Sequence, residues 1–274
     1  MTQIGPSQTQ FVHIGPARVA YTDLGTGPGV VLVHGAGANK DINWGPLSER
    51  LKGQRRVVAL DLSGSGETTD DGGPLTVEQL ADQVAGVADA AGLDIFQLVG
   101  YSMGSVVAAV VAARQPERVR SLSLVATWAR SNARIRFMIG LRDRLYHSDR
   151  EAWARLTVLL GTGPETFALM DDTSLDGLIQ MMVAGTTQPG ADGLLAQQAM
   201  VVRTDIHDLL PTITAPTQVI GFTRDQMIVV ENAREVHHLI PGAQYAELDA
   251  GHLAPFQHPD AFARLVGDFV LGQA

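Results

Sequence analysis

The sequence predicts an α/β fold built on a parallel sheet, and three observations lead to this prediction. Short apolar runs rich in β-branched residues recur along the chain, which is typical of strands buried on both faces of a sheet. Segments long enough for a helix separate these runs, and this alternation indicates an α/β architecture. The 274 residues, 45% of them hydrophobic, can bury one sizeable core. We therefore expect one domain, with a lid inserted into it.

The strands follow from two patterns. After a polar start, two short strands joined by Gly15 and Pro16 are expected at residues 11–14 and 18–23, as in a hairpin. The continuous apolar pattern of buried strands then follows at residues 30–33, 57–60, 96–99, 122–125 and 217–222. Helices are expected at residues 75–91, 102–114, 229–239 and 260–271, with Thr76 as a cap of the first.

The long stretch at residues 128–210 has no strand pattern but carries apolar residues at helical spacing. It predicts a helical lid, inserted between two parts of the core at residues 1–127 and 211–274. Most of its apolar side chains are expected to pack inside the lid. The residues expected to line a substrate cavity are Phe137, Met138 and Met181, together with Trp128 at the start of the lid and Gly35 in the core.

Composition limits the possible partners. The formal net charge of −9 disfavours nucleic acid and anionic lipid, so a small-molecule substrate is expected. The first ten residues lack the basic start and apolar run of a secretory signal, and no apolar run is long enough to span a bilayer. The absence of cysteine fits a reducing compartment. We therefore expect a cytoplasmic protein without membrane partners, either a monomer or a homodimer.

Ser102 is the strongest candidate for a nucleophile. It lies between Gly100 and Gly104, directly after a predicted strand and directly before a predicted helix. A strand, a tight turn and a helix form the context in which an exposed, strained serine becomes nucleophilic, and the flanking glycines let strand and helix approach each other. The competing interpretation is an ordinary glycine-rich turn, because short motifs also occur by chance.

Two backbone amides are candidates to stabilise an oxyanion. The helix after the serine begins at the amide of Met103, where free N–H groups and the helix dipole favour negative charge. The loop that follows the strand at residues 30–33 is placed to supply the second donor, which we assign to the amide of Ala36. His34 in the same loop is expected to orient the loop rather than to act as a base.

A serine hydroxyl needs a base, and the base needs an acid that orients it. His252, in a loop before the last helix, is the preferred base, and Asp225, after the strand at residues 217–222, is the preferred acid, because both match the order serine, aspartate, histidine. The alternatives are the acids Asp249, Asp205 and Asp208 and the bases His258, His237 and His238. Asp249 is expected to end a strand of its own.

Taken together, the glycine-flanked Ser102, the loop at His34, the glycines after Asp61, Asp225 and His252 resemble the α/β-hydrolase superfamily over nearly the whole chain. The resemblance implies an eight-stranded, mostly parallel sheet flanked by helices, a lid after the sixth strand, a Ser102–His252–Asp225 triad and no cofactor. Ser63 stands where many members of the superfamily carry arginine, and Ser105 stands where a further glycine is common. The segment at residues 124–130, with the arginine-rich helix after it, is similar to aminoacrylate or enol-lactone hydrolases.

Three other patterns in the sequence could indicate binding sites. His252 and His258 with Asp260 could bind a metal, but no histidine pair at helical spacing accompanies them, so we expect no metal site. The glycine pairs of the chain do not complete a dinucleotide-binding motif. Five arginines at the start of the lid are expected to form a solvated helix face, although they could instead bind a substrate carboxylate: Arg130, Arg134, Arg136, Arg142 and Arg144.

Three functions fit these residues. The first is a serine hydrolase that cleaves an ester, lactone or thioester of a small hydrophobic metabolite through an acyl-Ser102 intermediate. The second uses the same triad for elimination, cyclisation or carbon–carbon bond cleavage, because the site rather than the fold decides the reaction. The third is a ligand receptor that keeps the fold without turnover. An acyl adduct on Ser102 separates the first from the second, and reaction with a fluorophosphonate separates both from the third.

Overall fold

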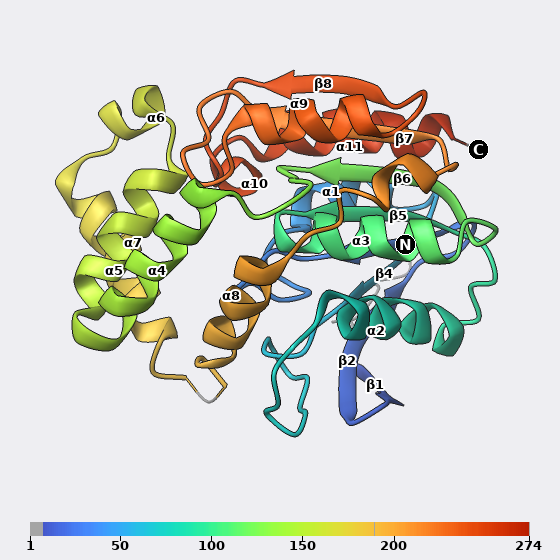
Figure 1. The fold of residues 1–274 in the computed structure, drawn as a ribbon, viewed down its shortest axis with the longest axis horizontal. Coiled ribbons are helices and arrows are strands. Elements are labelled where there is room, and N and C mark those ends of the chain that lie inside the picture. Colours follow the sequence, from blue (N-terminus) through green and yellow to red (C-terminus); the bar gives the residue numbers. More distant parts are fainter. Residues whose placement is uncertain (1–7, 189, 274) are drawn as a thin grey trace.

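The structure, a computed structural model, describes residues 8–188 and 190–273, so most of the polar start considered above lies outside the described residues. The described residues form one eight-stranded sheet in the order β1-β2-β4-β3-β5-β6-β7-β8 (Figure 1). The strands are β1 (Gln10–Ile14), β2 (Ala17–Leu24), β3 (Gly29–Val33), β4 (Arg56–Leu60), β5 (Phe96–Tyr101), β6 (Val119–Val125), β7 (Thr217–Phe222) and β8 (Gln244–Leu248). Strand β2 pairs antiparallel with β1 and β4, and the pairs from β4 to β8 are parallel. This confirms the expected α/β fold with a mostly parallel sheet.

Helices cover both faces of the sheet. Side chains of strand β3 alternate between the two faces: Val30 and Leu32 pack into one apolar cluster, and Val31 and Val33 pack into the other. The helices α1 (Gly45–Leu51) and α11 (Pro259–Gly272) contribute to the first cluster, and α2 (Val77–Ala90), α3 (Met103–Arg114) and α9 (Val230–Leu239) contribute to the second. Strands buried on both sides explain the continuous apolar runs of the sequence.

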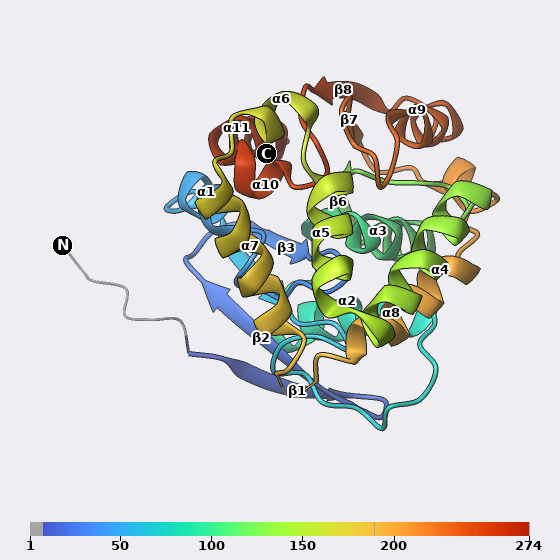
Figure 2. The same cartoon turned by 90° about the vertical axis from the view of Figure 1, so that its left-hand side faces the viewer.

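A group of helices lies between β6 and β7. It contains α4 (Ala133–Ser148), α5 (Arg150–Gly161), α6 (Pro164–Ala168), α7 (Asp172–Gly185) and α8 (Gly193–Arg203), followed by the 3-10 turn η1 (Leu210–Thr212). Figures 1 and 2 show α4 to α7 beside the sheet, at the end where the parallel strands terminate. Asn132, Asp149 and Asp171 begin α4, α5 and α7, and each side chain accepts a hydrogen bond from a backbone N–H of the first turn.

The inserted helices have an apolar cluster of their own. Tyr146, Trp153 and Ile179 are its large buried members, and Leu194 joins it from α8. Trp153 packs edge to face against Tyr146, with ring centroids 5.4 Å apart. None of the helices in the described residues is both long and apolar enough to cross a membrane.

Candidate active site

Ser102 lies in the tight turn between β5 and α3, with an unusual backbone conformation of φ 53° and ψ −122°. Its amide donates to the carbonyl of Val125 at the end of β6, at 2.8 Å. The turn leaves no room for a side chain at either of the flanking glycines. A Cβ atom on Gly100 would lie 2.3 Å from the Gly104 carbonyl oxygen, and one on Gly104 would lie 2.1 Å from the Val33 carbonyl oxygen. The turn therefore holds the serine at the end of the sheet with its backbone strained.

His252 faces this serine from the loop after β8. Its Nε2 lies 3.0 Å from the Ser102 Oγ, within hydrogen-bond distance. The phenol of Tyr101 donates a hydrogen bond to the His252 carbonyl, and the two rings pack with centroids 5.3 Å apart. Burial raises the pKa of the Tyr101 phenol well above its usual value, with a smaller contribution from the Asp225 carboxylate, so this hydrogen-bond donor keeps its proton at neutral pH.

Asp225 fixes the other side of the imidazole. Its Oδ2 lies 2.6 Å from the His252 Nδ1, and its Oδ1 accepts from the amides of Met227 and Ile228 at 2.7 and 2.9 Å. The carboxylate is fully buried, and the loop after β7 positions it. Because two backbone amides orient the acid, the histidine ring has one preferred orientation toward the serine.

The alternative acids lie elsewhere. Asp249 is exposed and binds the hydroxyl of Thr223 and the guanidinium of Arg224. Asp208 is fully exposed beside His207, and Asp205 accepts a hydrogen bond from the amide of that histidine.

The alternative histidines also lie away from the Ser102 hydroxyl or bind other groups. The Nε2 of His258 lies 3.2 Å from the Thr166 hydroxyl, and His237 and His238 stand on α9, where the Nδ1 of His238 binds the Arg234 carbonyl. His34 is buried, its Nδ1 donates to the Gly35 carbonyl, and its Nε2 accepts from the amide of Leu62. Burial lowers the pKa of His34, so the ring is neutral and braces the loop after β3.

That loop approaches Ser102 closely. A Cβ atom on Gly35 would lie 3.2 Å from the Ser102 Cβ, so the glycine allows the backbone to pass beside the serine. Gln197 of α8 holds the loop by accepting from the Gly37 amide at 2.9 Å. Within the described residues, the backbone N–H groups of Ala36 and Met103 donate no hydrogen bond to another protein group, so both are available to a ligand.

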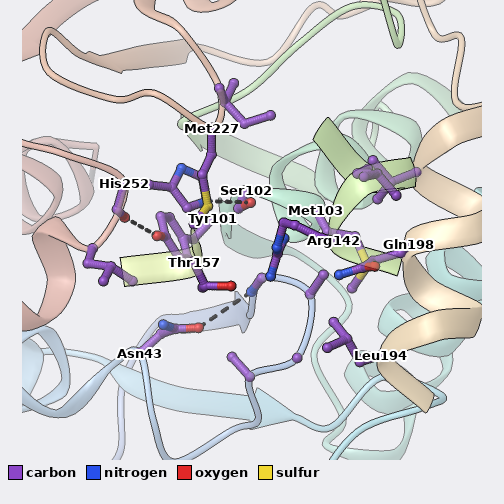
Figure 3. Close-up of a pocket in the computed structure, with 18 of the residues that line it drawn as sticks. Asn43, Tyr101, Ser102, Met103, Arg142, Thr157, Leu194, Gln198, Met227 and His252 are labelled. Carbon is purple, nitrogen blue, oxygen red and sulfur yellow. Dashed lines mark hydrogen bonds between the residues drawn. The ribbon is translucent and has the colours of Figure 1, made fainter. Parts of the chain in front are cut away.

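A cavity of about 420 Å³ opens at these residues (Figure 3). The predicted residues that border it are Gly35, Ala36, Ser102, Met103, Trp128, Met138, Met181 and His252. The prediction for Phe137 is wrong: its side chain is 78% exposed and lies outside the lining. Phe137 lies on the face of α4 that is turned away from the cavity, whereas Met138 and Ile139 of the same helix border it.

Several polar lining residues were not predicted. Asn43, Thr157 and Gln198 border the cavity, and Figure 3 labels them among its side chains. Their sequence surroundings contain no motif, so only the folded arrangement identifies them. Of the five arginines considered for carboxylate binding, which lie at the start of the inserted helices, only Arg142 borders the cavity. The others point elsewhere; Arg134, for example, binds the Gln226 carbonyl.

Known proteins resemble this chain over most of its length. It is 36% identical over 96% of its length to pyrrolizixenacetamide deacetylase of Xenorhabdus hominickii, covering 98% of that protein. It is 30% identical over 89% of its length to a pimeloyl-[acyl-carrier protein] methyl ester esterase of Neisseria meningitidis serogroup C, covering 93% of it. A solved structure of a thermophilic esterase from Thermogutta terrifontis matches with a TM-score of 0.82 and 27% identity, over 97% of this chain and 99% of the esterase. The family model described as the alpha/beta hydrolase fold matches residues 28–259, and the chain belongs to this family.

Proposed function

We propose that this protein is a serine hydrolase that cleaves an ester or amide of a small, largely apolar molecule through an acyl-Ser102 intermediate. The observation that carries the proposal is the continuous contact from Ser102 Oγ to His252 Nε2, at 3.0 Å, and from His252 Nδ1 to Asp225 Oδ2, at 2.6 Å. A serine hydroxyl becomes a nucleophile when an oriented imidazole can take its proton.

The reaction has two stages. Ser102 Oγ attacks the substrate carbonyl carbon while its proton passes to His252 Nε2, and Asp225 stabilises the resulting imidazolium. His252 then gives this proton to the leaving alcohol or amine, which departs as the bond from the carbonyl carbon breaks. A water molecule attacks the acyl-Ser102, gives its proton to His252, and the returning proton restores the Ser102 hydroxyl as the acid leaves.

The oxyanion of each tetrahedral intermediate is assigned to the amides of Ala36 and Met103. Met103 is the first residue of α3, where the helix dipole favours negative charge. The loop that carries Ala36 is held on one side by His34 and on the other by Gln197. Donors fixed in this way need no rearrangement when charge develops, which is the main source of their catalytic effect.

The relatives support hydrolysis at a carbonyl but differ in the bond they cleave. By their names, one is an acetamide deacetylase and another a methyl ester esterase. The cavity is bordered by apolar side chains such as Met138, Met182 and Leu194, which suits the hydrophobic part of either kind of substrate. We therefore propose an ester or a simple amide as the substrate class.

Labelling by a fluorophosphonate tests the proposal. The wild-type protein should form a stoichiometric adduct, and peptide mass spectrometry should place the adduct on Ser102. Ser102→Ala should not react, and Ser105→Ala, which changes the buried serine three residues along α3, should still be labelled. A folded wild-type protein that does not react with the probe, and that hydrolyses no p-nitrophenyl ester or anilide, would refute the proposal.

A further inference from the structure

One charged side chain borders the cavity without an anionic partner. Arg142 reaches the cavity from α4, and its Nε is buried without a hydrogen-bond partner among the described residues. None of the described side chains that line the cavity is a carboxylate. The guanidinium lies over the ring of Trp153, with its Cζ 5.8 Å from the ring centroid, but the ring carries no negative charge that would neutralise it.

A second polar side chain that borders the same cavity also lacks hydrogen-bond partners among the described residues. Gln198 borders the same cavity from α8 and is only 3% exposed. Neither its Nε2 nor its Oε1 has a hydrogen-bond partner within residues 8–188 and 190–273. Figure 3 shows both Gln198 and Arg142 among the side chains around the cavity that also contains Ser102 and His252.

Leaving these groups unpaired is unfavourable. Burial lowers the pKa of Arg142 to about 10, so the guanidinium still carries its charge at neutral pH, in surroundings that disfavour it. A buried carboxamide without partners loses the hydrogen bonds that it makes to water in the unfolded chain. A ligand that accepts hydrogen bonds and carries negative charge would remove both penalties.

We propose that Arg142 and Gln198 form a recognition site for a carboxylate carried by the substrate. The two parallel N–H groups of a guanidinium match the two oxygens of a carboxylate, and the Gln198 Nε2 offers a further donor. This inference rests on the proposed hydrolysis at Ser102 and narrows its substrate class: a molecule with a cleavable ester or amide at one point, an apolar middle and a free carboxylate at another.

Matched pairs of esters test the site. Each pair consists of the p-nitrophenyl monoester of a dicarboxylic acid, from succinic to pimelic, and the same compound with its free carboxylate capped as a methyl ester. For at least one chain length, the wild-type protein should favour the free acid in kcat/KM, by about 10- to 100-fold. Arg142→Met should abolish this preference, and Arg142→Lys should retain part of it, because it keeps the charge but not the paired donors.

Arg144→Met is the control, because Arg144 stands on the same helix, is exposed and does not border the cavity. It should keep the preference of the wild-type protein. A ratio of free to capped esters that is equal in the wild type and Arg142→Met, at every length, would overturn the inference. Stronger inhibition by an alkyl phosphate than by the alkyl carboxylate of equal length would also overturn it, because it would assign the site to phosphate.

A binding measurement separates this inference from the proposed hydrolysis. Ser102→Ala should bind a dicarboxylate monoester in isothermal titration calorimetry, and Ser102→Ala with Arg142→Met should bind it at least about tenfold more weakly. If the wild-type protein hydrolyses no ester while this difference in binding is present, the hydrolase proposal fails and the carboxylate site remains. If esters are hydrolysed and the difference is absent, the carboxylate site fails.

Discussion

Gln197 and Gln198 are consecutive buried residues of α8, but only the Gln197 side chain makes hydrogen bonds within the described residues. The Gln197 carboxamide accepts from the Gly37 amide at 2.9 Å and donates to the Ser63 carbonyl at 3.0 Å and the Ser65 hydroxyl at 2.8 Å. The Gln198 carboxamide has no partner among the described residues, although it is just as buried. The first residue therefore joins the inserted helices to the loops around Ser102, and the second leaves its polar atoms to the cavity.

Replacing each glutamine by leucine should separate these two roles. Gln197→Leu should lower the free energy of unfolding by about 2 kcal/mol or more, because it leaves the Ser63 carbonyl and the Ser65 hydroxyl buried without this partner. Gln198→Leu should leave stability unchanged or raise it, because it removes an unsatisfied polar group. Urea unfolding at pH 7 measures both. Equal losses in the two variants would contradict the assignment.

The orientation of His252 by Asp225 predicts a large effect of a small substitution. Asp225→Asn should reduce kcat by about 10⁴-fold, because an amide in place of the carboxylate favours the wrong imidazole tautomer and no longer stabilises the imidazolium. Asp249→Asn is the matched control, since Asp249 is exposed and binds Thr223 and Arg224. Steady-state kinetics on a p-nitrophenyl ester would test both variants, and a loss below tenfold in Asp225→Asn would show that another group orients the histidine.

The candidate catalytic residues could be identified from the sequence alone, because their positions depend on local chain order. Ser102 is identified by its two glycines, and Asp225 and His252 by the strand ends and loops that precede the last helices. The edge strand β8 has no apolar run, because its residues are half-exposed or exposed, and the pattern of buried strands does not apply to it. The expectation that a strand ends at Asp249 nevertheless agrees with β8, which ends at Leu248. The short α1 was not predicted.

The lining of the cavity could not be predicted in the same way. Arg142 and Arg144 belong to one helix and to one charged segment, but only Arg142 borders the cavity. Which of them turns inward depends on the rotation of α4 against α5 and α8, and this rotation is set by packing between segments distant in the chain. The same dependence explains why Met138 lines the cavity while Phe137 does not.

The charge of Arg142, whose Nε is buried although the residue is partly exposed, predicts a gain in stability on its removal. Burial lowers its pKa from the usual guanidinium value to about 10, so the folded state binds this proton less tightly than the unfolded state. The charged side chain therefore lowers stability at every pH below about 10, and the cost is relieved only as the pH rises above that value.

Arg142→Met should accordingly raise the free energy of unfolding by about 1 kcal/mol or more, uniformly between pH 6 and 9. Arg144→Met should leave it unchanged, because its side chain is exposed. Chemical unfolding at pH 6, 7.5 and 9 measures these differences. A loss of stability in Arg142→Met that exceeds that of Arg144→Met would show that the packing of Arg142 on Trp153 outweighs the cost of its charge.

The backbone of Ser102 supplies a test that does not depend on any substrate. A positive φ at a residue with a Cβ atom costs about 1–3 kcal/mol, whereas glycine adopts it freely. Ser102 has φ 53° because the turn between β5 and α3 leaves no other path, with Gly100 and Gly104 in contact on either side. Removing the hydroxyl alone keeps this strain, and removing the whole side chain relieves it.

Ser102→Gly should therefore be more stable than Ser102→Ala, by about 1 kcal/mol, even though a glycine elsewhere in a folded chain lowers stability by increasing the freedom of the unfolded state. Both variants lack the hydroxyl, so the difference between them reports only the strain. Thermal unfolding followed by circular dichroism measures it. If Ser102→Ala is the more stable of the two, the turn does not strain its central residue, and the exposed position of the serine must be maintained by its hydrogen bond to Val125 instead.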